Sequence, residues 1–267
     1  MTDSKKVSVL MGVYNCEKTV KQAIQSIQNQ TYKNWELIIC DDGSTDETYE
    51  VVKQEADKDN RIILIKNPCN VGLNKTLNNC LAKATGSYIA RMDGDDDCFP
   101  DRFERQLEAL HEKSGVDIVS SPMILFDENG EWGRTHAMEY PTAEAVVSGS
   151  PICHAPVMIR KECLDAVGGY TEDARVLRVE DVDLWIKLYA AGYRCYNIQE
   201  PLYRMRNDRN ALNRRKYQYR INSTRVRLKG CRKLGLGFRF YLKAFRPMII
   251  GLVPAGVRAK YRRKHGY

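Results

Sequence analysis

Residues 87–97 read SYIARMDGDDD, a short apolar run that ends in four carboxylates within five positions. The run Ser87–Met92 has the length and the aliphatic and aromatic content of a β-strand. Two earlier segments repeat this arrangement, because Val7–Met11 is followed by GVYN and Trp35–Cys40 by DDGSTD. Parallel strands present their carboxyl ends at one edge of a sheet, where α/β proteins bind ligands. We therefore expect three polar clusters to meet at one edge of a parallel sheet.

Helical patterns separate these strands. Apolar residues recur with the helical period in Thr19–Gln28, Asp46–Ala56 and Leu73–Ala84, and Arg61–Lys66 reads as a further strand. This repetition predicts right-handed crossovers, and hence an α/β, Rossmann-like fold whose mainly parallel sheet is flanked by helices. Residues 122–149 read as loops and edge strands. The remaining patterns predict helices at Arg102–Leu110 and Asp181–Ala191 and strands at Asp117–Ser121, Ala155–Arg160 and Tyr193–Ile198.

The composition is that of a globular protein, with 43% hydrophobic and 28% charged residues. The nine cysteines are odd in number and no two are separated by only two residues, which indicates neither a disulfide framework nor a zinc knuckle. The first residues, MTDSKK, lead into the first strand without the apolar core of a signal peptide. We therefore expect a reducing, cytoplasmic environment.

The net charge of +8 conceals an uneven distribution. Residues 204–267 carry 20 Lys or Arg and one acid, Asp208, whereas the rest of the chain has 22 basic and 33 acidic residues. A basic segment attached to an acidic body indicates an anionic partner. We therefore expect an α/β domain of residues 1–205 and a basic, partly amphipathic helical C-terminal extension of residues 206–267.

The extension contains a helical stretch at about Ala211–Lys233 and an apolar run at Pro247–Val257. That run has 11 residues, whereas about 20 are needed to cross a bilayer. We expect it to lie among lipid headgroups, with arginines facing phosphate and with the aromatic anchors Phe238, Phe240, Tyr241 and Phe245. Nucleic acid is the alternative partner, because basic residues interleaved with aromatic ones also suit phosphates and stacked bases.

Local structure explains half of the DDGSTD segment. Gly43 permits a turn with positive φ, and Ser44 or Thr45 is expected to cap the following helix. Asp41 and Asp42 are left without a structural explanation. A carboxylate at this position accepts the N–H of a pyrimidine or the hydroxyls of a ribose, which indicates nucleoside binding.

The four acids of DGDDD repel one another, so the cluster is costly unless it is a solvated loop or a cation compensates it. An EF-hand calcium loop is one alternative, because Asp93, Asp95, Asp97 and Glu104 occupy its positions 1, 3, 5 and 12. We exclude it, since Cys98 stands where that loop requires glycine and a strand precedes it. A hard divalent ion held by one or two carboxylates, together with diphosphate and water, fits better.

Glu180 and Asp181 open a predicted helix after an irregular, glycine-containing approach. Two interpretations stay open: the acids stabilise the helix N-terminus through its dipole, or one carboxylate faces the cleft opposite the metal. His154 is open in the same way, either as a hydrogen-bonded structural residue or as a site residue.

Taken in order, the segments VSVLMGVYN, WELIICDDGSTD, NVGLNKTLN, GSYIARMDGDDD, PDRFERQ, VGGY and EDVDLW resemble the motifs of family 2 glycosyltransferases with the GT-A fold. The resemblance covers about residues 5–205. It implies an inverting transferase, with a hexose as the expected transferred unit, that uses a nucleotide-diphospho-sugar together with Mg²⁺ or Mn²⁺. A UDP-sugar is the donor most commonly implied, with dTDP- and GDP-sugars as alternatives.

The resemblance implies roles for individual residues of the donor site. Val13, Tyr14 and Asn15 would border the nucleoside. Asp42 would contact the base, and Lys75 would approach the diphosphate.

The resemblance also implies a metal site and a general base. Asp93 and Asp95 match the DXD motif, with Asp95 as the direct metal ligand and Asp93 as the second acid, nearer the ribose and the sugar. Asp96 would share either role. Asp181 matches the general base of the ED motif, and Glu180 would support it.

Two departures from other family members are visible. Gly12 stands where many relatives have proline, which bears on the shape of the loop after the first strand. The QxxRW motif of processive polysaccharide synthases is absent, so we expect a non-processive enzyme that adds one sugar at a time. The resemblance implies an acceptor on a lipid carrier or a surface-polysaccharide intermediate. For the extension we therefore favour an anionic membrane at the inner face of the cell over nucleic acid.

Two other nucleotide-dependent classes are disfavoured by the segment GVYNCEKT after the first strand. A sugar-nucleotide pyrophosphorylase requires a glycine-rich loop with Arg or Lys there. A dinucleotide oxidoreductase requires GxGxxG at the same place.

Overall fold

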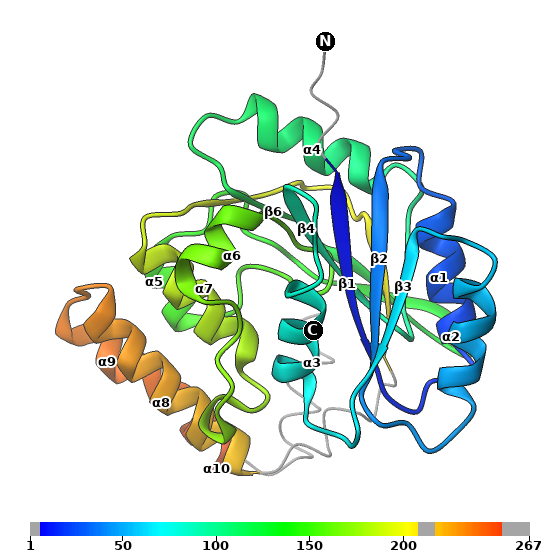
Figure 1. Cartoon of the computed structure of the whole chain (residues 1–267). Coiled ribbons are helices and arrows are strands. Elements are labelled where there is room, and N and C mark those ends of the chain that lie inside the picture. The colour runs from blue at the N-terminus through cyan, green and yellow to red at the C-terminus, as the bar shows by residue number, and fades with distance from the viewer. Residues whose placement is uncertain (1–5, 208–216, 253–267) are drawn as a thin grey trace.

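The central element of the computed structural model, which describes residues 6–207 and 217–252, is a seven-stranded sheet in the order β10-β6-β9-β4-β1-β2-β3 (Figure 1). The strands are β1 (Val7–Val13), β2 (Trp35–Asp41), β3 (Ile62–Lys66), β4 (Tyr88–Asp93), β6 (Ile118–Ser120), β9 (Met158–Arg160) and β10 (Cys195–Asn197). Each overlaps one of the strands that the sequence predicted.

Most neighbouring strands of this sheet are parallel. β4, β1, β2 and β3 form parallel pairs, as do β6 and β10, whereas β9 is antiparallel to both β4 and β6. The prediction of a mainly parallel sheet is therefore confirmed, with one reversed strand. The register sets Gly12 beside both Cys40 and Asp93, so the ends of β1, β2 and β4 lie at one edge.

Helices cover both faces of the sheet (Figure 1). One face packs against α1 (Val20–Gln28), α2 (Thr48–Ala56) and α4 (Arg102–Glu112), and the other against α3 (Leu73–Leu81), α6 (Lys161–Val167) and α7 (Glu180–Ala190). Successive side chains of a strand point to opposite faces. Val9 and Met11 accordingly pack in the cluster that contains α1, and Leu10 packs in the cluster that contains α3.

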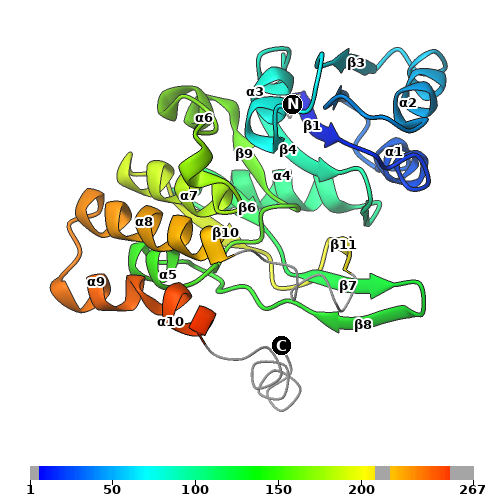
Figure 2. The ribbon, with the colours of Figure 1, turned by 90° about the horizontal axis from the view of Figure 1, so that it is seen from below.

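A second, four-stranded sheet adjoins the acid cluster. Its order is β5-β11-β7-β8, from β5 (Asp97–Cys98), β11 (Tyr203–Arg206), β7 (Met123–Asp127) and β8 (Gly130–Arg134). Figure 2 shows β7 and β8 side by side with β11 next to them. The region expected to hold loops and edge strands thus forms β7, β8 and α5 (Ala143–Ser148). Antiparallel pairing of β5 with β11 sets Asp97 opposite Arg204.

The described part of the C-terminal extension forms α8 (Tyr217–Lys233), α9 (Phe238–Ala244) and α10 (Arg246–Leu252). α8 packs closely on α7, because a Cβ added at Gly230 would lie 2.5 Å from Cδ1 of Ile186. The helix predicted at about Ala211–Lys233 is confirmed from Tyr217 onwards, while residues 211–216 and 253–257 lie outside the described residues. The division of the chain at residue 205 stays a prediction.

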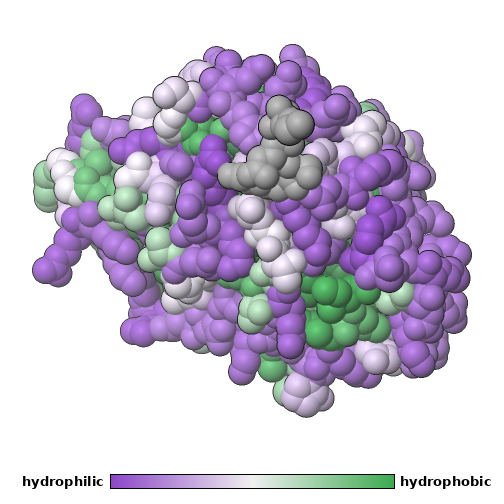
Figure 3. Space-filling view, turned by 45° about the horizontal axis from the view of Figure 1, so that its top comes forward, coloured by the Kyte–Doolittle hydropathy of each residue, from purple (hydrophilic) through white to green (hydrophobic). Residues whose placement is uncertain are grey.

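One of the expected membrane anchors is buried. Phe240 is 7% exposed and packs in the cluster that contains α5 and α7, so its prediction as an anchor was wrong. Phe238 and Leu252 are exposed by 76% and 75%. Figure 3 shows hydrophobic groups at the left edge of the molecule, where Figures 1 and 2 show α8 meeting α9. Within residues 6–207 and 217–252, no helix has the length and hydrophobicity needed to cross a bilayer.

Candidate active site

The carboxyl ends of β1, β2 and β4 open into two adjoining cavities. The larger, of about 800 Å³, extends from the loop after β1 to the segment before α7, and the smaller, of about 550 Å³, extends to the acids after β4. Gly12, Val13 and Tyr14 line both cavities. The three polar clusters that follow β1, β2 and β4 therefore meet at one edge of the sheet.

Most of the predicted site residues line one or both cavities. The larger cavity is lined by Val13, Tyr14, Asp42, Lys75 and Glu180, and the smaller by Val13, Tyr14, Asn15, Asp93 and Asp95. Asp181 lines neither cavity, although it follows Glu180 directly in the first turn of α7.

Gly43 provides the turn after β2 that the sequence predicted. Its φ is 71°, a backbone conformation that residues other than glycine rarely adopt. A Cβ there would lie 2.6 Å from the carbonyl carbon of Cys69, so a larger residue collides with the backbone. Glycine thus allows the loops after β2 and β3 to touch beside the larger cavity.

The cap predicted for the next helix was wrong. Ser44 and Thr45 both contact Asn15: the Asn15 amide donates to Ser44 Oγ at 3.1 Å, and the Thr45 amide donates to Asn15 Oδ1 at 2.9 Å. Asp46 instead accepts the amide of Thr48, where α2 begins, at 3.0 Å. The helix starts later than expected because the two hydroxyl residues hold the loop after β1.

Asp42 holds the loop that borders the larger cavity. The side chain is buried, and its Oδ1 accepts the Asn67 side-chain amide at 2.8 Å and the Val71 amide at 2.9 Å. Among the residues that the structure describes, its Oδ2 accepts a hydrogen bond only from the Gly72 amide, at 2.9 Å. A carboxylate oxygen accepts two hydrogen bonds, so Oδ2 keeps capacity for a ligand.

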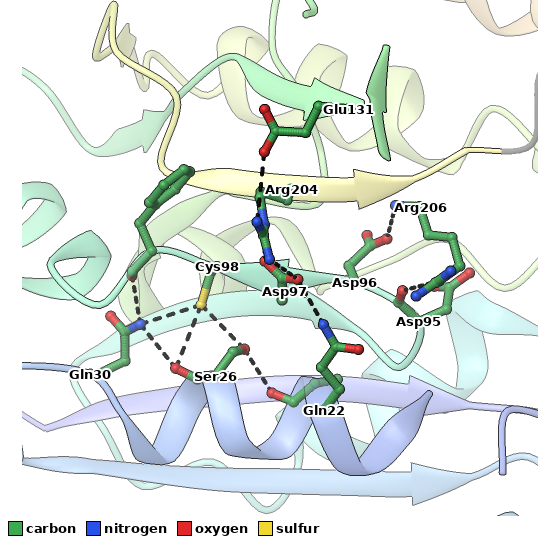
Figure 4. A network of polar contacts seen from close by, with 12 residues as sticks. Gln22, Ser26, Gln30, Asp95, Asp96, Asp97, Cys98, Glu131, Arg204 and Arg206 are labelled. Atoms are coloured by element: carbon green, nitrogen blue, oxygen red, sulfur yellow. Dashed lines mark hydrogen bonds and ion pairs between the residues drawn. The ribbon is translucent and has the colours of Figure 1, made fainter. Parts of the chain in front are cut away.

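Asp97 is neutralised inside the protein (Figure 4). Its two oxygens accept the Arg204 guanidinium at 2.6 and 2.8 Å, and Gln22 donates to it at 3.1 Å. Two parallel hydrogen bonds between opposite charges are a strong and geometrically specific pair. One of the four clustered carboxylates is therefore already compensated by an arginine.

The negative charges of the other acids in the cluster are neutralised by basic side chains to different extents. Asp93 is 2.5 Å from the buried guanidinium of Arg91. Within the described part of the chain, no Lys or Arg forms an ion pair with Asp95 or Asp96. Burial, followed by the charge of Asp93, raises the pKa of Asp95, and burial with the charges of Asp93 and Asp95 raises the pKa of Asp96 to about 9. The repulsion expected from the sequence thus persists at these two residues.

A divalent cation fits the smaller cavity by the chemistry of its donors. Asp93 and Asp95 both line this cavity, and carboxylate oxygens are the ligands that hard cations prefer. Among residues 6–207 and 217–252, no group of three or more His, Cys, Asp or Glu side chains is arranged to hold a metal ion. Most ligands of such an ion would therefore come from a bound molecule and water.

Glu180 and Asp181 differ in their access to the cleft. Glu180 lines the larger cavity, and its Oε2 is buried without a hydrogen-bond partner among the described residues. Burial and then the charge of Asp181 raise the pKa of Glu180, while burial raises the pKa of Asp181 against the opposing effect of Arg227 and Arg91. The position of Glu180 favours a carboxylate that faces the cleft over acids that serve only the helix dipole.

The arrangement of these acids agrees with a comparison of the chain with known families, in which the family described as Glycosyl transferase family 2 matches residues 8–168. The chain belongs to glycosyltransferase family 2. Among similar proteins, EpsE of Bacillus subtilis (strain 168) is 42% identical over 265 residues, which cover 99% of this chain and 95% of that protein.

Two further comparisons concern a named activity and the fold. The glycosyltransferase is 30% identical over 193 residues to the Escherichia coli UDP-Glc:alpha-D-GlcNAc-diphosphoundecaprenol beta-1,3-glucosyltransferase WfaP, covering 72% of this chain and 73% of WfaP. A mannosyltransferase of Pyrobaculum calidifontis, solved with GDP-Man and Mn²⁺, superposes with a TM-score of 0.64 at 17% identity, covering 99% of this chain and 80% of that one. At this identity the likeness shows the shared fold alone.

Arg206 is a residue of the glycosyltransferase site that sequence reasoning missed, because it was counted with the basic extension. It lines the smaller cavity, and its Nε donates to the Asp95 carbonyl at 3.2 Å. Its guanidinium lies 4.8 Å from the ring centre of Phe126. The pairing of β11 with β5 brings Arg206 to the acid cluster, and Figure 4 shows it beside Asp95 and Asp96.

His154 is a hydrogen-bonded structural residue in this glycosyltransferase. Its Nε2 is 2.8 Å from the hydroxyl of Tyr170, and its ring packs edge-on against Trp185 with centres 5.7 Å apart. Burial lowers the pKa of His154 well below its usual value, so the ring is neutral. It lines neither cavity.

Proposed function

We propose that this family 2 glycosyltransferase is an inverting, non-processive enzyme of polysaccharide biosynthesis. It moves one hexose from a nucleotide-diphospho-sugar to an acceptor hydroxyl. The observation that carries the proposal is that Asp93 and Asp95 line one cavity, Glu180 lines the adjoining one, and the end of β1 borders both. Acids suited to a metal thus line one cavity, and one acid of the Glu180–Asp181 pair lines the adjoining cavity.

The donor nucleoside is proposed to occupy the larger cavity, whose volume of about 800 Å³ suits a nucleotide. Tyr14, which is 48% exposed, offers a ring for stacking, and Asp42 offers Oδ2 to the base. Val13 and Asn15 border the nucleoside, and Lys75 approaches the diphosphate. A UDP-sugar is the first candidate, in line with the UDP-Glc named for WfaP, and a GDP-sugar is the alternative.

Asp95 and Asp93 are proposed to hold Mg²⁺ or Mn²⁺ against the donor diphosphate. When bound, such an ion supplies positive charge to the departing diphosphate. Arg206 lines the same cavity and adds a fixed positive charge from the protein. Asp96 stays beside these residues without contributing to the lining.

Asp181, which is half-buried and directly follows the cavity residue Glu180, is proposed to remove the proton of the acceptor hydroxyl as that oxygen attacks the anomeric carbon, with Glu180 supporting it. The raised pKa of Asp181 makes it a stronger base than an ordinary aspartate, which favours proton transfer. The nucleotide departs on the side of Asp93 and Asp95. Attack and departure therefore use opposite faces of the sugar, and the anomeric configuration inverts.

A screen of nucleotide sugars tests this function. The full-length protein is incubated with UDP-, GDP- and dTDP-hexoses and Mn²⁺, and thermal stability is measured. We expect one nucleotide class to raise the Tm, and we expect the product formed with a lipid-linked acceptor to carry one added sugar of inverted configuration by NMR. A protein that no nucleotide sugar stabilises would contradict the proposal, as would a retained configuration.

The C-terminal extension is proposed to bind an anionic membrane, which makes the enzyme cytoplasmic and peripheral at the inner face of the cell membrane. Residues 217–252 contain nine Lys or Arg and no Asp or Glu. The large exposed apolar side chains of α9, of α10 and of the residue between them are Phe238, Leu242, Phe245, Ile249 and Leu252. Such a surface suits lipid headgroups, near an acceptor like the diphosphoundecaprenol named for WfaP.

Vesicle flotation tests the membrane proposal. We expect the protein to float with vesicles that contain anionic lipid and to remain unbound with neutral vesicles. Replacing Leu242 and Ile249 by Ser should weaken flotation. Replacing Tyr241 by Phe should leave it unchanged, because Tyr241, although expected as an anchor, is partly buried against the cluster that contains α5 and α7. Flotation that is independent of lipid charge would contradict the proposal, and so would a stronger association with RNA in a mobility-shift assay.

A further inference from the structure

The first helix of the C-terminal extension reaches the larger cavity. Tyr219 on α8 lines this cavity, although α8 lies outside the part of the chain that the family model matches. The same cavity is also lined by Ala174, Leu177 and Arg178, from the segment that leads into α7. We call residues 174–178 the cavity wall. Its last residue is two positions before Glu180.

The cavity wall has little regular structure of its own. Ala174–Val176 form a single turn of 3₁₀ helix, and Arg178 has a φ of 65°, which is uncommon for a residue with a long side chain. Ala174, Leu177 and Arg178 are all exposed at the cavity. A short segment in such a conformation keeps its shape only where neighbouring groups fix it.

Asn222 on α8 holds the backbone of the cavity wall in this conformation. The residue is 2% exposed, and its Nδ2 donates to the carbonyl of Ala174 at 3.2 Å and to the carbonyl of Leu177 at 3.3 Å. Its Oδ1 accepts Nε2 of Gln218 at 3.2 Å. Because both halves of the amide have partners, its orientation is determined and both amide hydrogens point at the cavity wall.

α8 is itself held firmly against the sheet domain. Arg227 is 8% exposed and donates to the carbonyls of Val147 and Gly149, the latter at 2.9 Å. Gly230 packs directly against Ile186 on α7. The side-chain amide of Asn222 therefore projects from a helix that is held in place. The position of the cavity wall depends on that helix.

We propose that Asn222 is a positioning residue of the donor site, which makes the C-terminal extension part of nucleotide binding. Through Ala174 and Leu177 it sets the wall so that Arg178 faces the anionic nucleoside diphosphate in the cavity. This inference rests on the proposed function, because it takes the larger cavity to be the nucleotide site. It assigns Asn222 no contact with the substrate.

Calorimetric binding of nucleotide to the full-length protein tests the proposal. The probes are UDP with Mn²⁺ and GDP with Mn²⁺, and the one that binds the wild-type protein is used for the variants. Asn222→Asp keeps the size of the side chain but removes both donors and sets a carboxylate against two carbonyls. Because two hydrogen bonds are lost, we expect the Kd to rise about tenfold at a temperature at which circular dichroism shows a folded protein.

Two further variants complete the test. Gln218→Ala removes only the group that orients Asn222 from an exposed position, and we expect a Kd rise of about two- to fivefold without loss of folding. Arg225→Ala changes an exposed residue of the same helix and should leave the Kd unchanged.

The outcomes separate the inference from the proposed function. A wild-type protein that binds neither UDP nor GDP with Mn²⁺ would overturn both. A wild-type protein that binds nucleotide while Asn222→Asp and Gln218→Ala bind it equally well would overturn only the inference, and a fall in Tm without a change in Kd counts in the same way. If Asn222→Asp fails to fold, an unchanged Kd in Gln218→Ala overturns it.

Discussion

The pair formed by Asp97 and Arg204 gives the sharpest test of how the acid cluster is built. Arg204→Met removes the guanidinium and leaves the Asp97 carboxylate, whose side chain is 8% exposed, next to Asp95 and Asp96. A buried carboxylate that loses its partner keeps the cost of desolvation without the attraction that offset it. We therefore expect this single substitution to destabilise the protein.

The magnitude follows from the burial of the two partners. Removing one partner of a buried ion pair costs about 3–5 kcal/mol, whereas an exposed pair contributes about 0–1 kcal/mol. The Arg204 side chain is 39% exposed, so water screens the pair from one side. We expect an intermediate loss of about 2 kcal/mol in the free energy of unfolding, which corresponds to a fall in Tm of about 4–8 °C for a chain of this size.

Chemical denaturation followed by circular dichroism measures this loss. The double variant Arg204→Met/Asp97→Asn should recover part of it, because no unpaired buried charge remains. Arg105→Met is the matched control, since it breaks an exposed pair with Glu200, whose side chain is 66% exposed, and should change stability by less than about 0.5 kcal/mol. A stability of Arg204→Met equal to that of the control would show that the Asp97–Arg204 pair does not stabilise the acid cluster.

Three further predictions concern catalysis and the turn after β2. Asp181→Asn should lower turnover by about 10²–10⁴-fold, as expected for loss of a general base, while calorimetry shows unchanged nucleotide binding; undiminished turnover would remove Asp181 from the mechanism. Because burial raises the pKa of Asp181, this base loses its charge at a higher pH than an ordinary aspartate, so kcat/KM should fall on acidification through a pKa above about 3.9; an acid limb at or below that value would contradict the assignment. Gly43→Ala should destabilise the protein by clearly more than Gly115→Ala in thermal unfolding, because both glycines have a φ of 71° but only Gly43 would place a Cβ against the backbone of Cys69; equal losses would show that this contact has no effect.

The sheet was predictable from the sequence because its strands other than β3 are buried at most positions. Such strands read as short continuous apolar runs, and Trp35–Asp41, for example, is buried at every position. The sequence of a strand does not show in the same way whether the strand runs parallel or antiparallel to its neighbours. The reversal of β9 between β4 and β6 depends on how the chain returns to the sheet, and the composition of Met158–Arg160 does not record it.

The position of the acid cluster was predicted from the sequence, but the arginine partners of its individual carboxylates were not. The prediction assigned roles at the metal and sugar to Asp93, Asp95 and Asp96, but it gave Asp97 no partner. In the structure Asp97 pairs with Arg204, which is 107 residues away, and Arg206 reaches Asp95 from the same strand. These pairings depend on β11 lying beside β5, and a contact between strands so distant in sequence has no local signature.

The two errors in local structure have a similar origin. Ser44 and Thr45 have the right chemistry for a helix cap, but Asn15 from another loop engages both. Phe240 has the right chemistry for a membrane anchor, but α9 turns it towards α5 and α7. In both cases the residue type is compatible with two structural roles, and tertiary contacts determine which role the residue has.

The acids after β4 are proposed to bind a divalent cation together with a sugar nucleotide. The most direct measurement is the affinity for Mn²⁺ by electron paramagnetic resonance, with and without saturating UDP or GDP, for the wild-type protein and for Asp95→Asn. We expect weak binding of Mn²⁺ alone and binding at least about tenfold tighter with one nucleotide, because the diphosphate would supply further ligands. Asp95→Asn should lose this gain. An affinity for Mn²⁺ that neither nucleotide increases, or a gain that survives in Asp95→Asn, would contradict the proposal.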